Sequence, residues 1–338
     1  MRIVLVTDAW TPQVNGTVRT LSTLVELLRT DYGDAVEVIG PDRFATVPAP
    51  GYKEIRFAVA PCRRLAALLD VAEPDAVHIA TEGPLGWSAR AECRRRGWSF
   101  TTAFHARFPE YLRLRTGIPE GWTWAVLRRF HAAGSGTMAA TGSLAKELAG
   151  RRFERVLPWT RGVDLDRFRA PPGGDAWCGL PRPLWLCVGR VAVEKNLAAF
   201  LSLDLPGTKA VVGDGPALPP LRVRFPEAVF TGRQDGDRLA ASYASADVFV
   251  FPSRTDTFGL VLLEALACGT PVAAFPVPGP LDVLDGAPPG VGALDENLRA
   301  ACLRALDAAD SEACRRYAGA WSWTACAAQF RAALVPVR

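Results

Sequence analysis

The sequence lacks any apolar run that approaches the ~18 residues needed to span a membrane. Met1 and Arg2 lead directly into the strand-like run 3–6, so we expect no signal peptide and no transmembrane helix. The eight cysteines contain no C-x-x-C pair. We therefore expect reduced structural thiols and a cytoplasmic protein.

Two further absences narrow the function. The G-x-G-x-x-G fingerprint of dinucleotide binders does not occur, which disfavours a dehydrogenase. The net charge is only +4 and no recognised nucleic-acid module is present, so a nucleic-acid partner is not expected. Apolar residues make up 49% of the chain and charged residues 22%, which fits a compact α/β protein rather than a disordered one.

At 338 residues the chain is long enough for two domains of roughly 150 residues each. Short β-rich runs alternate with helical patterns, so we predict an α/β fold of two doubly wound, Rossmann-like domains at 1–166 and 183–316. A Pro- and Gly-rich linker is expected at 167–182, and a C-terminal helix at about 317–338 is expected to pack back on the first domain. The predicted strands are 2–8, 35–40, 76–81, 100–105 and 136–141 in the first domain, and 183–190, 209–215, 228–233, 247–253 and 271–276 in the second.

Charged residues at strand ends are the first candidates for a site, because ligands in such folds bind beyond the carboxyl ends of the strands. Strand 183–190 ends in Gly189 and Arg190, and Lys195 follows as a helix begins. Two fixed cations there can hold a diphosphate, at about 1.5–3 kcal/mol for each charge-assisted contact. The alternative is a solvated surface pair.

The stretch SRTDTFGLVLLEALACGTPV, residues 253–272, places a helix start directly after a predicted strand. The amides of Gly259 and Leu260 suit a phosphate. Asp256 precedes this helix, where it can hold sugar hydroxyls or serve only as a cap. Glu264 lies in an apolar run, where a carboxylate is costly unless donors match it. It can accept both hydroxyls of a ribose, or it is a structural partner for an arginine.

The first half contributes Gly16 and His105. Gly16 lies near the start of the first helix, where its backbone can approach an anion, and a structural turn is an equally good interpretation. His105 closes a predicted strand at the ligand-binding edge of the sheet. For His78 and His131, in a predicted strand and helix, we expect ordinary packing.

Taken in order, these motifs resemble the retaining glycosyltransferases of family 4, whose GT-B fold has two Rossmann-like domains around a cleft. The resemblance rests on GRVAVEKN, VGDGP, FTGR, ADVFVFPS and TDTFGLVLLEALACGTPV, and it spans nearly the whole chain. The segments VTDAWTPQVNGTVRTL and FHARFPEYLRLRTGIP are similar to the branch that contains bacterial mannosyl- and glycolipid-forming transferases.

The resemblance implies a donor site in the second domain. Arg190 and Lys195 would grip the nucleotide diphosphate, with the amides of Gly259 and Leu260 on a phosphate. Glu264 would bind the ribose.

Three more residues would surround the transferred sugar. The resemblance implies that Asp256 faces the donor hexose, that His105 approaches the transferring sugar and that Gly16 shapes a phosphate loop in the first domain. The family's usual first acid in E-x7-E is Glu, whereas this chain has Asp256, one methylene shorter. This departure leaves the reaction class unchanged and bears on the choice of donor sugar.

The implied reaction moves a hexosyl group from a UDP- or GDP-sugar to a hydroxyl with retained anomeric configuration. The nucleoside-diphosphate sugar is a co-substrate, and no other cofactor is expected. We also predict activity without a metal ion, because the Asp-Leu-Asp run at 164–166 lies beside the predicted linker.

Segment 105–131 interleaves five arginines with aromatic residues, among them Trp122, Trp124 and Phe130. This pattern suits the surface of an anionic membrane. The alternative is that Trp122, Val126 and Phe130 pack inward along one helical face.

The leading hypothesis is therefore a peripheral enzyme on the inner face of the cell membrane, with a membrane lipid such as diacylglycerol as acceptor. The same chemistry on a soluble sugar or polysaccharide precursor is the first alternative. A sugar-nucleotide epimerase of similar fold is the second, and a non-catalytic sugar-nucleotide sensor is the third.

Overall fold

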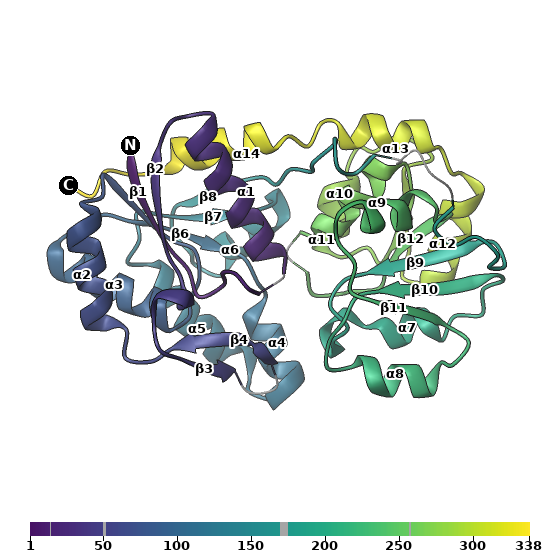
Figure 1. The fold of residues 1–338 in the computed structure, drawn as a ribbon, viewed down its shortest axis with the longest axis horizontal. Coiled ribbons are helices and arrows are strands. Elements are labelled where there is room, and N and C mark those ends of the chain that lie inside the picture. Colours follow the sequence, from purple (N-terminus) through teal and green to yellow (C-terminus); the bar gives the residue numbers. More distant parts are fainter. Residues whose placement is uncertain (14, 50–51, 170–174, 257) are drawn as a thin grey trace. The chain divides into compact units, whose positions relative to one another are not determined.

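The computed structural model describes residues 1–13, 15–49, 52–169, 175–256 and 258–338. The chain divides into two compact units, residues 1–161 with 323–338 and residues 162–322 (Figure 1). The predicted linker at 167–182 falls partly on 170–174, which lie outside the described residues, and its described part groups with the second unit.

The first unit is built on a parallel sheet with the strand order β2-β1-β5-β6-β7-β8. Its inner strands are buried on both faces, as parallel strands are when helices cover both sides of a sheet. Its strands are β1 (Arg2–Val6), β2 (Ala35–Ile39), β5 (Ala76–Ile79), β6 (Thr101–Phe104), β7 (Gly136–Ala139) and β8 (Val156–Pro158), and β3 (Thr46–Ala49) and β4 (Tyr52–Ala58) form a separate antiparallel pair.

Apolar residues at helical spacing explain how the helices pack on this sheet. In the first helix Val18, Leu21, Val25 and Leu28 are all buried, as their spacing predicts, and the Asn15 side chain caps the helix by accepting from the Val18 amide (3.0 Å). The helices are α1 (Gly16–Thr30), α2 (Cys62–Ala72), α3 (Pro84–Arg96), α4 (Phe108–Thr116), α5 (Glu120–His131), α6 (Gly142–Gly150) and α14 (Trp323–Ala333), with a 3₁₀ turn η1 (Pro41–Arg43).

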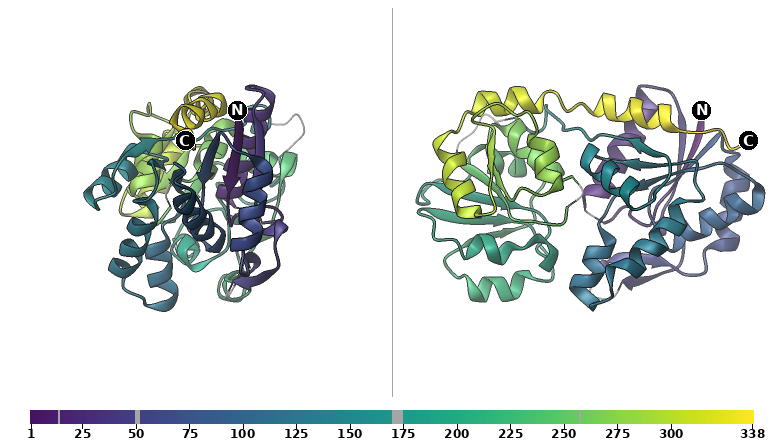
Figure 2. Two further views of the ribbon diagram at one scale, coloured as in Figure 1. Left: turned by 90° about the vertical axis from the view of Figure 1, so that its left-hand side faces the viewer. Right: turned by 180° about the vertical axis from the view of Figure 1, so that it is seen from behind.

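The last helix belongs to the first unit although its sequence follows the second (Figure 2). Helix α14 lies beside α1, and Cys326 and Phe330 enter the apolar core that contains Leu24. Arg331 Nε also donates to Asp34 Oδ2 at 2.9 Å. The helix is shorter than we predicted, because α13 ends at Ala318 and a break precedes Trp323.

The second unit repeats the same architecture with the strand order β11-β10-β9-β12-β13-β14, all parallel. Its strands are β9 (Leu184–Val188), β10 (Thr208–Val212), β11 (Val229–Gly232), β12 (Val248–Phe251), β13 (Val272–Ala274) and β14 (Gly292–Leu294). Its helical elements are η2 (Val193–Lys195), α7 (Leu197–Leu201), α8 (Leu218–Arg224), α9 (Gly236–Ala244), α10 (Leu260–Cys268), α11 (Pro278–Leu284), α12 (Leu298–Asp307) and α13 (Ser311–Ala318).

Both units are doubly wound, which confirms the predicted α/β fold class. The strand order reverses beside β1 in the first unit and beside β9 in the second. These reversals create crevices at β1/β5 and β9/β12, where ligands bind in folds of this kind. The residues that follow these four strands are therefore the candidates for a ligand site.

Candidate active site

The β9/β12 crevice of the second unit carries several of the predicted site residues. Gly189 and Arg190 follow β9, and Ser253 to Asp256 follow β12, its neighbour in the sheet. Arg190 is half-buried. A Cβ on Gly213, after β10, would lie 1.8 Å from the Gly189 carbonyl oxygen, so only glycine lets these two loops approach so closely.

Lys195 and Asp256 form an ion pair at this crevice. The Lys195 Nζ atom lies 2.6 Å from Asp256 Oδ1 and 2.8 Å from Oδ2. Their side chains are 26% and 14% exposed, so the pair is partly shielded from water. The two loops are also joined where Asn196 Nδ2 donates to the Pro252 carbonyl oxygen at 3.0 Å. These bonds hold a cation and a carboxylate in fixed positions beyond the strand ends.

Helix α10 begins beside this pair with its backbone amides uncapped. Gly259, the N-cap residue, has φ 88°, which a residue with a Cβ rarely adopts, and as a glycine it has no side chain to cap the helix. The Asp256 carboxylate bonds to Lys195 and does not cap the helix. Thr257 lies outside the described residues. The amides of Gly259 and Leu260 thus belong to a helix start whose positive dipole end suits an anion.

Glu264 is buried in the middle of α10, only 3% exposed. The hydroxyl of Tyr243, on α9, donates to Glu264 Oε2 at 2.9 Å. The residue belongs to the same helix whose start follows the β12 loop. A carboxylate in this position can accept further hydrogen bonds from hydroxyls that lie beyond the start of the helix.

A cysteine lies near this charged pair but is not a nucleophile. Burial raises the pKa of the Cys187 thiol, at the end of β9, to about 12, and the Lys195 cation offsets only part of that shift. All eight cysteines, each within the described part of the chain, are free thiols. The charged side chains and backbone amides are therefore the candidate reactive groups of this crevice.

His105 lies directly after β6 in the first unit and is half-buried. Its ring meets the Trp159 ring edge-on, with centroids 5.3 Å apart. Burial, and then the nearby Arg161 guanidinium, lower the pKa of His105 well below its usual 6.5, so the imidazole is neutral at pH 7.

Sequence reasoning missed Arg161 as the neighbour of His105. The Arg161 side chain is buried, stacks over the Trp159 ring at 4.2 Å and donates to the Trp159 carbonyl oxygen at 2.7 Å. An arginine shortly after a strand is only a weak indication of a functional residue. His105 and Arg161 are also 56 positions apart, so the sequence does not show that they are neighbours. His78 and His131 are buried, in agreement with the predicted packing.

The β1/β5 crevice of the first unit is occupied by a side chain of the protein itself. Asp8, after β1, accepts hydrogen bonds from Thr81 Oγ1 (2.9 Å) and from the amides of Leu85 (2.9 Å) and Gly86 (3.3 Å) at the start of α3. Asp8 is 6% exposed. Gly16 lies apart from this contact as the exposed first residue of α1.

Comparison with known proteins explains this combination of folds and charges. Residues 14–167 match the family described as Glycosyltransferase Family 4, and residues 182–307 match Glycosyl transferases group 1. A GDP-mannose-dependent alpha-mannosyltransferase of Mycolicibacterium smegmatis is 33% identical over 84% of this chain and 82% of its own length. The chain belongs to glycosyltransferase family 4.

Two more proteins place this family 4 glycosyltransferase among its relatives. An alpha-monoglucosyldiacylglycerol synthase of Streptococcus pneumoniae is 27% identical over 81% of this chain and 71% of that protein. The sucrose-phosphate synthase structure from Thermosynechococcus elongatus superposes with a TM-score of 0.77 at 21% identity, covering 98% of this chain and 97% of that one. The latter likeness shows that the fold is GT-B.

The glycosyltransferase presents exposed apolar and basic side chains on α5. Trp122 is 78% exposed and Val126 is 52% exposed, whereas Phe130 is buried, so the alternative of inward packing is wrong for Trp122 and Val126 and correct for Phe130. The basic Arg128 and Arg129 are exposed on the same helix. No helix within the described ranges is long and apolar enough to cross a membrane.

Other residues of the predicted membrane segment are buried, which corrects part of that prediction. Trp124 and Phe130 lie in apolar cores, and Arg107 bonds to Glu110 and Glu147 inside the unit. The side chains of Tyr111 and Arg115 lie outside the described set. Two positions correspond to about 200° around an α-helix, so Trp124 faces away from Trp122, and only part of the segment can meet a surface.

Proposed function

We propose that this glycosyltransferase moves a hexosyl group from a UDP- or GDP-sugar to a membrane lipid such as diacylglycerol, with retained anomeric configuration. The Lys195–Asp256 pair beside the uncapped start of α10 carries this proposal. Arg190, Lys195 and the α10 amides bind the diphosphate. Fixed donors of this kind are effective because they need little rearrangement when negative charge develops.

The remaining residues of the site take roles around the sugar and the nucleoside. Glu264 accepts the ribose hydroxyls, and Asp256 faces the hexose. His105, neutral at pH 7, approaches the transferring sugar as a hydrogen-bonding group rather than a cation. Gly16 shapes the phosphate loop of the first unit.

The chemical step separates charge in a direction that these residues favour. As the bond from the anomeric carbon to the diphosphate oxygen breaks, the diphosphate gains negative charge and the sugar gains oxocarbenium character. Interactions that strengthen in this transition state accelerate the reaction, so Lys195 and Arg190 contribute most there. The departing phosphate accepts the proton of the attacking hydroxyl on the same face, without a protein nucleophile.

The exposed surface of α5 supports a lipid acceptor. Trp122 and Val126 supply apolar contacts at an interface, and Arg128 and Arg129 supply charge, at about 1 kcal/mol for each basic group near anionic headgroups. The relative from Streptococcus pneumoniae is named for a diacylglycerol product, which favours the same class of acceptor. The enzyme then works at the membrane surface as a peripheral protein.

A donor panel tests the function directly. Purified enzyme receives UDP- and GDP-sugars with mixed lipids, and the product is identified by mass; GDP-mannose is tested first because of the mannosyltransferase relative. We expect a glycolipid, with activity retained in excess chelator. A water-soluble glycoside would replace the lipid acceptor with a sugar acceptor, and epimerised nucleotide sugar without transfer would overturn the proposal.

A further inference from the structure

The Lys195–Asp256 pair occupies most of the hydrogen-bonding capacity of the lysine. A lysine ammonium has three N–H donors, and the two carboxylate oxygens of Asp256 lie 2.6 and 2.8 Å from Lys195 Nζ. A diphosphate that approached this pair would find at most one donor of the ammonium and, beside it, a carboxylate of its own sign. The two roles proposed for these residues, toward the diphosphate and toward the hexose, therefore require the pair to separate.

The backbone beside this pair is held by bonds within the chain. Asn196, directly after Lys195, has φ 52°, and its Nδ2 donates to the Pro252 carbonyl oxygen at 3.0 Å. Ser253 Oγ donates to the Glu194 carbonyl oxygen at 3.3 Å. These bonds join the loops that follow β9 and β12, so the lysine can change its partner by moving its flexible side chain alone.

The pair is shielded from water but still accessible. The side chains of Lys195 and Asp256 are 26% and 14% exposed, whereas those of Arg316 and Glu312, a surface pair on α13, are 67% and 81% exposed. Shielding makes an ion pair stronger than an exposed one. Because both side chains retain some exposure, a more highly charged anion can reach the ammonium and compete with the carboxylate.

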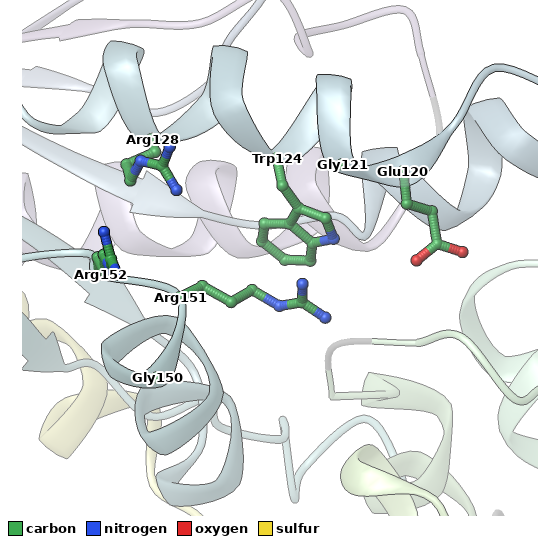
Figure 3. Close-up of a pocket in the computed structure, with 7 residues that line it drawn as sticks. All are labelled: Glu120, Gly121, Trp124, Arg128, Gly150, Arg151 and Arg152. Atoms are coloured by element: carbon green, nitrogen blue, oxygen red, sulfur yellow. The ribbon is translucent and has the colours of Figure 1, made fainter.

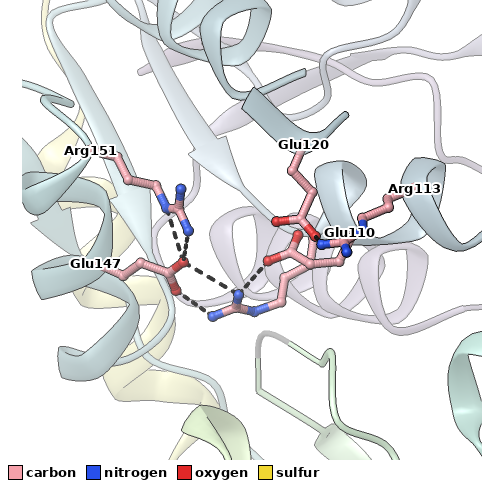
Figure 4. A network of polar contacts seen from close by, with 6 residues as sticks. Glu110, Arg113, Glu120, Glu147 and Arg151 are labelled. Atoms are coloured by element: carbon pink, nitrogen blue, oxygen red, sulfur yellow. Dashed lines mark hydrogen bonds and ion pairs between the residues drawn. The ribbon is translucent and has the colours of Figure 1, made fainter. Parts of the chain in front are cut away.

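The charged groups of the first unit are arranged differently. Arg151 lies alongside the Trp124 ring in Figure 3, with its guanidinium carbon 4.0 Å from the ring centre, and it also donates to Glu147. Glu147 accepts from Arg107 as well, and Arg107 donates to Glu110, in the network that the dashed lines of Figure 4 mark. Because these groups share partners, an anion that displaced one contact would leave the others in place. Within the described ranges, the pair of the second unit joins one cation to one carboxylate, so a competing anion can separate it completely.

We propose that the diphosphate of the donor displaces Asp256 from Lys195, and that Asp256 takes the lysine back when the nucleotide leaves. This exchange rests on the proposed function. As the diphosphate oxygens replace the carboxylate on the ammonium, Asp256 is released to accept hydroxyls of the hexose. After transfer, the return of Asp256 to Lys195 weakens the hold on the nucleoside diphosphate and favours its release. Asp256 thus couples diphosphate binding to sugar recognition and to product release.

Calorimetric titration of UDP and GDP into the full chain tests the exchange, with the nucleotide that the wild type binds more tightly. Asp256→Asn keeps the size of the side chain but weakens its hold on the ammonium, so it should bind this nucleotide about tenfold more tightly than the wild type. Glu312→Gln, which removes an equal charge from the surface pair, should change the affinity less than about twofold. Misfolding cannot produce a gain in affinity. Unchanged or weaker binding by Asp256→Asn would overturn the proposal.

A double-mutant cycle separates partner exchange from simple repulsion, because Asp256 also repels a diphosphate through space. In a Lys195→Ala background, Asp256→Asn should change the affinity less than about twofold, since the ammonium that it frees is absent. An equal gain in both backgrounds would show repulsion alone and would overturn the exchange. Asp256→Glu retains a carboxylate that can reach the ammonium, so it should bind the nucleotide as the wild type does. Binding as tight as that of Asp256→Asn would contradict the proposal.

The dissociation rate tests the release role. Displacement of a fluorescent derivative of the same nucleotide, followed by stopped flow, should be about tenfold slower in Asp256→Asn than in the wild type. An unchanged rate would refute the return of Asp256 to the lysine. These measurements contain neither sugar nor lipid. If Lys195→Ala binds the nucleotide as tightly as the wild type, the proposed donor site fails. If Lys195→Ala weakens binding and Asp256→Asn does not strengthen it, only the exchange fails.

Discussion

In the first unit the crevice where the strand order reverses is filled by a carboxylate of the chain, whereas in the second unit the corresponding crevice is lined by cations. Asp8 accepts hydrogen bonds from the backbone amides at the start of α3 and is only 6% exposed. At β9/β12 the N-cap residue of α10 is Gly259, which has no side chain to cap the helix, and Lys195 forms an ion pair with Asp256 in the loop before it.

The same arrangement of strands and helices thus has a structural role in the first unit and a proposed ligand-binding role in the second. A helix start at the strand ends favours an anion in either unit. Where the chain supplies the anion, the contact joins β1 to α3 and stabilises the sheet. At β9/β12 the Asp256 carboxylate is held by Lys195, and we propose that the diphosphate of the donor is the anion at the start of α10.

Removing the cation of the second unit should abolish most activity while leaving the fold intact. Loss of about 4 kcal/mol of transition-state stabilisation in Lys195→Ala would reduce turnover roughly a thousandfold. Turnover with the best donor of the panel is the measurement. Arg316→Ala removes an equal charge from an exposed surface pair and should leave turnover unchanged. Near-normal turnover of Lys195→Ala would refute the division of roles.

Glu264→Gln should raise the donor KM about 10- to 100-fold, because a charged acceptor for the ribose is worth about 1.5–3 kcal/mol. Tyr243→Phe is the matched control, since it removes the hydroxyl that donates to Glu264 Oε2 without touching the charge of the carboxylate. Steady-state kinetics on both variants decide the role. If Tyr243→Phe raised KM as much as Glu264→Gln, the carboxylate would serve packing between α9 and α10.

Asp8→Asn should break the first unit's contact and cost stability rather than activity. The amide nitrogen of asparagine replaces one carboxylate oxygen and turns a donor toward the N–H of either Leu85 or Gly86, and a buried donor left unsatisfied costs about 1–3 kcal/mol. Urea unfolding should show this loss, with turnover per folded molecule preserved. Asp307→Asn, at an exposed carboxylate, should change stability by no more than about 0.5 kcal/mol. A stable but inactive Asp8→Asn would assign this crevice to catalysis.

The sequence predicted the central strands of both sheets, because buried Val- and Ile-rich runs are long and regular there. It also singled out Lys195 and Asp256 by their positions after predicted strands, and the structure brings these two side chains together. It did not predict β8 and β14, since three residues at a sheet edge give no periodic signal. The β3–β4 pair was missed as well, with residues 50 and 51 between its strands outside the described ranges.

Contacts between distant residues escaped prediction for a different reason. Asp8 and Thr81 are 73 positions apart and belong to separate loops, so only the parallel pairing of β1 with β5 brings them together. Arg161 and His105 are also far apart in the sequence and close enough in the fold for the Arg161 guanidinium to lower the pKa of His105. The sequence pattern also assigned Trp122 and Trp124 of α5 to one surface. They are two positions apart and lie on opposite faces of the helix, so Trp122 is exposed and Trp124 is buried.

The smallest expected effect concerns His105, and it tests whether the first unit contributes a neutral imidazole to the reaction. Because burial and Arg161 lower its pKa well below 6.5, His105 stays neutral in the folded enzyme as the pH falls from 7.5 to 6. We therefore expect kcat/KM to stay nearly constant over this range. A decline with a midpoint near 6.5 that disappears in His105→Gln would contradict the neutral state.

The free energy of unfolding, unlike kcat/KM, should fall as the pH is lowered through 6.5. The unfolded histidine has a pKa near 6.5 and takes up a proton that the folded His105 refuses, so its contribution to stability is complete above pH 6.5 and is lost below it. The slope reaches at most about 1.4 kcal/mol per pH unit for each such group. His78, whose pKa burial lowers to about 3, adds to this slope in the wild type and remains in His105→Gln. Urea unfolding at pH 7 and 5.5 should therefore show a smaller loss in His105→Gln than in the wild type, and equal losses would mean that His105 takes up its proton in the folded enzyme.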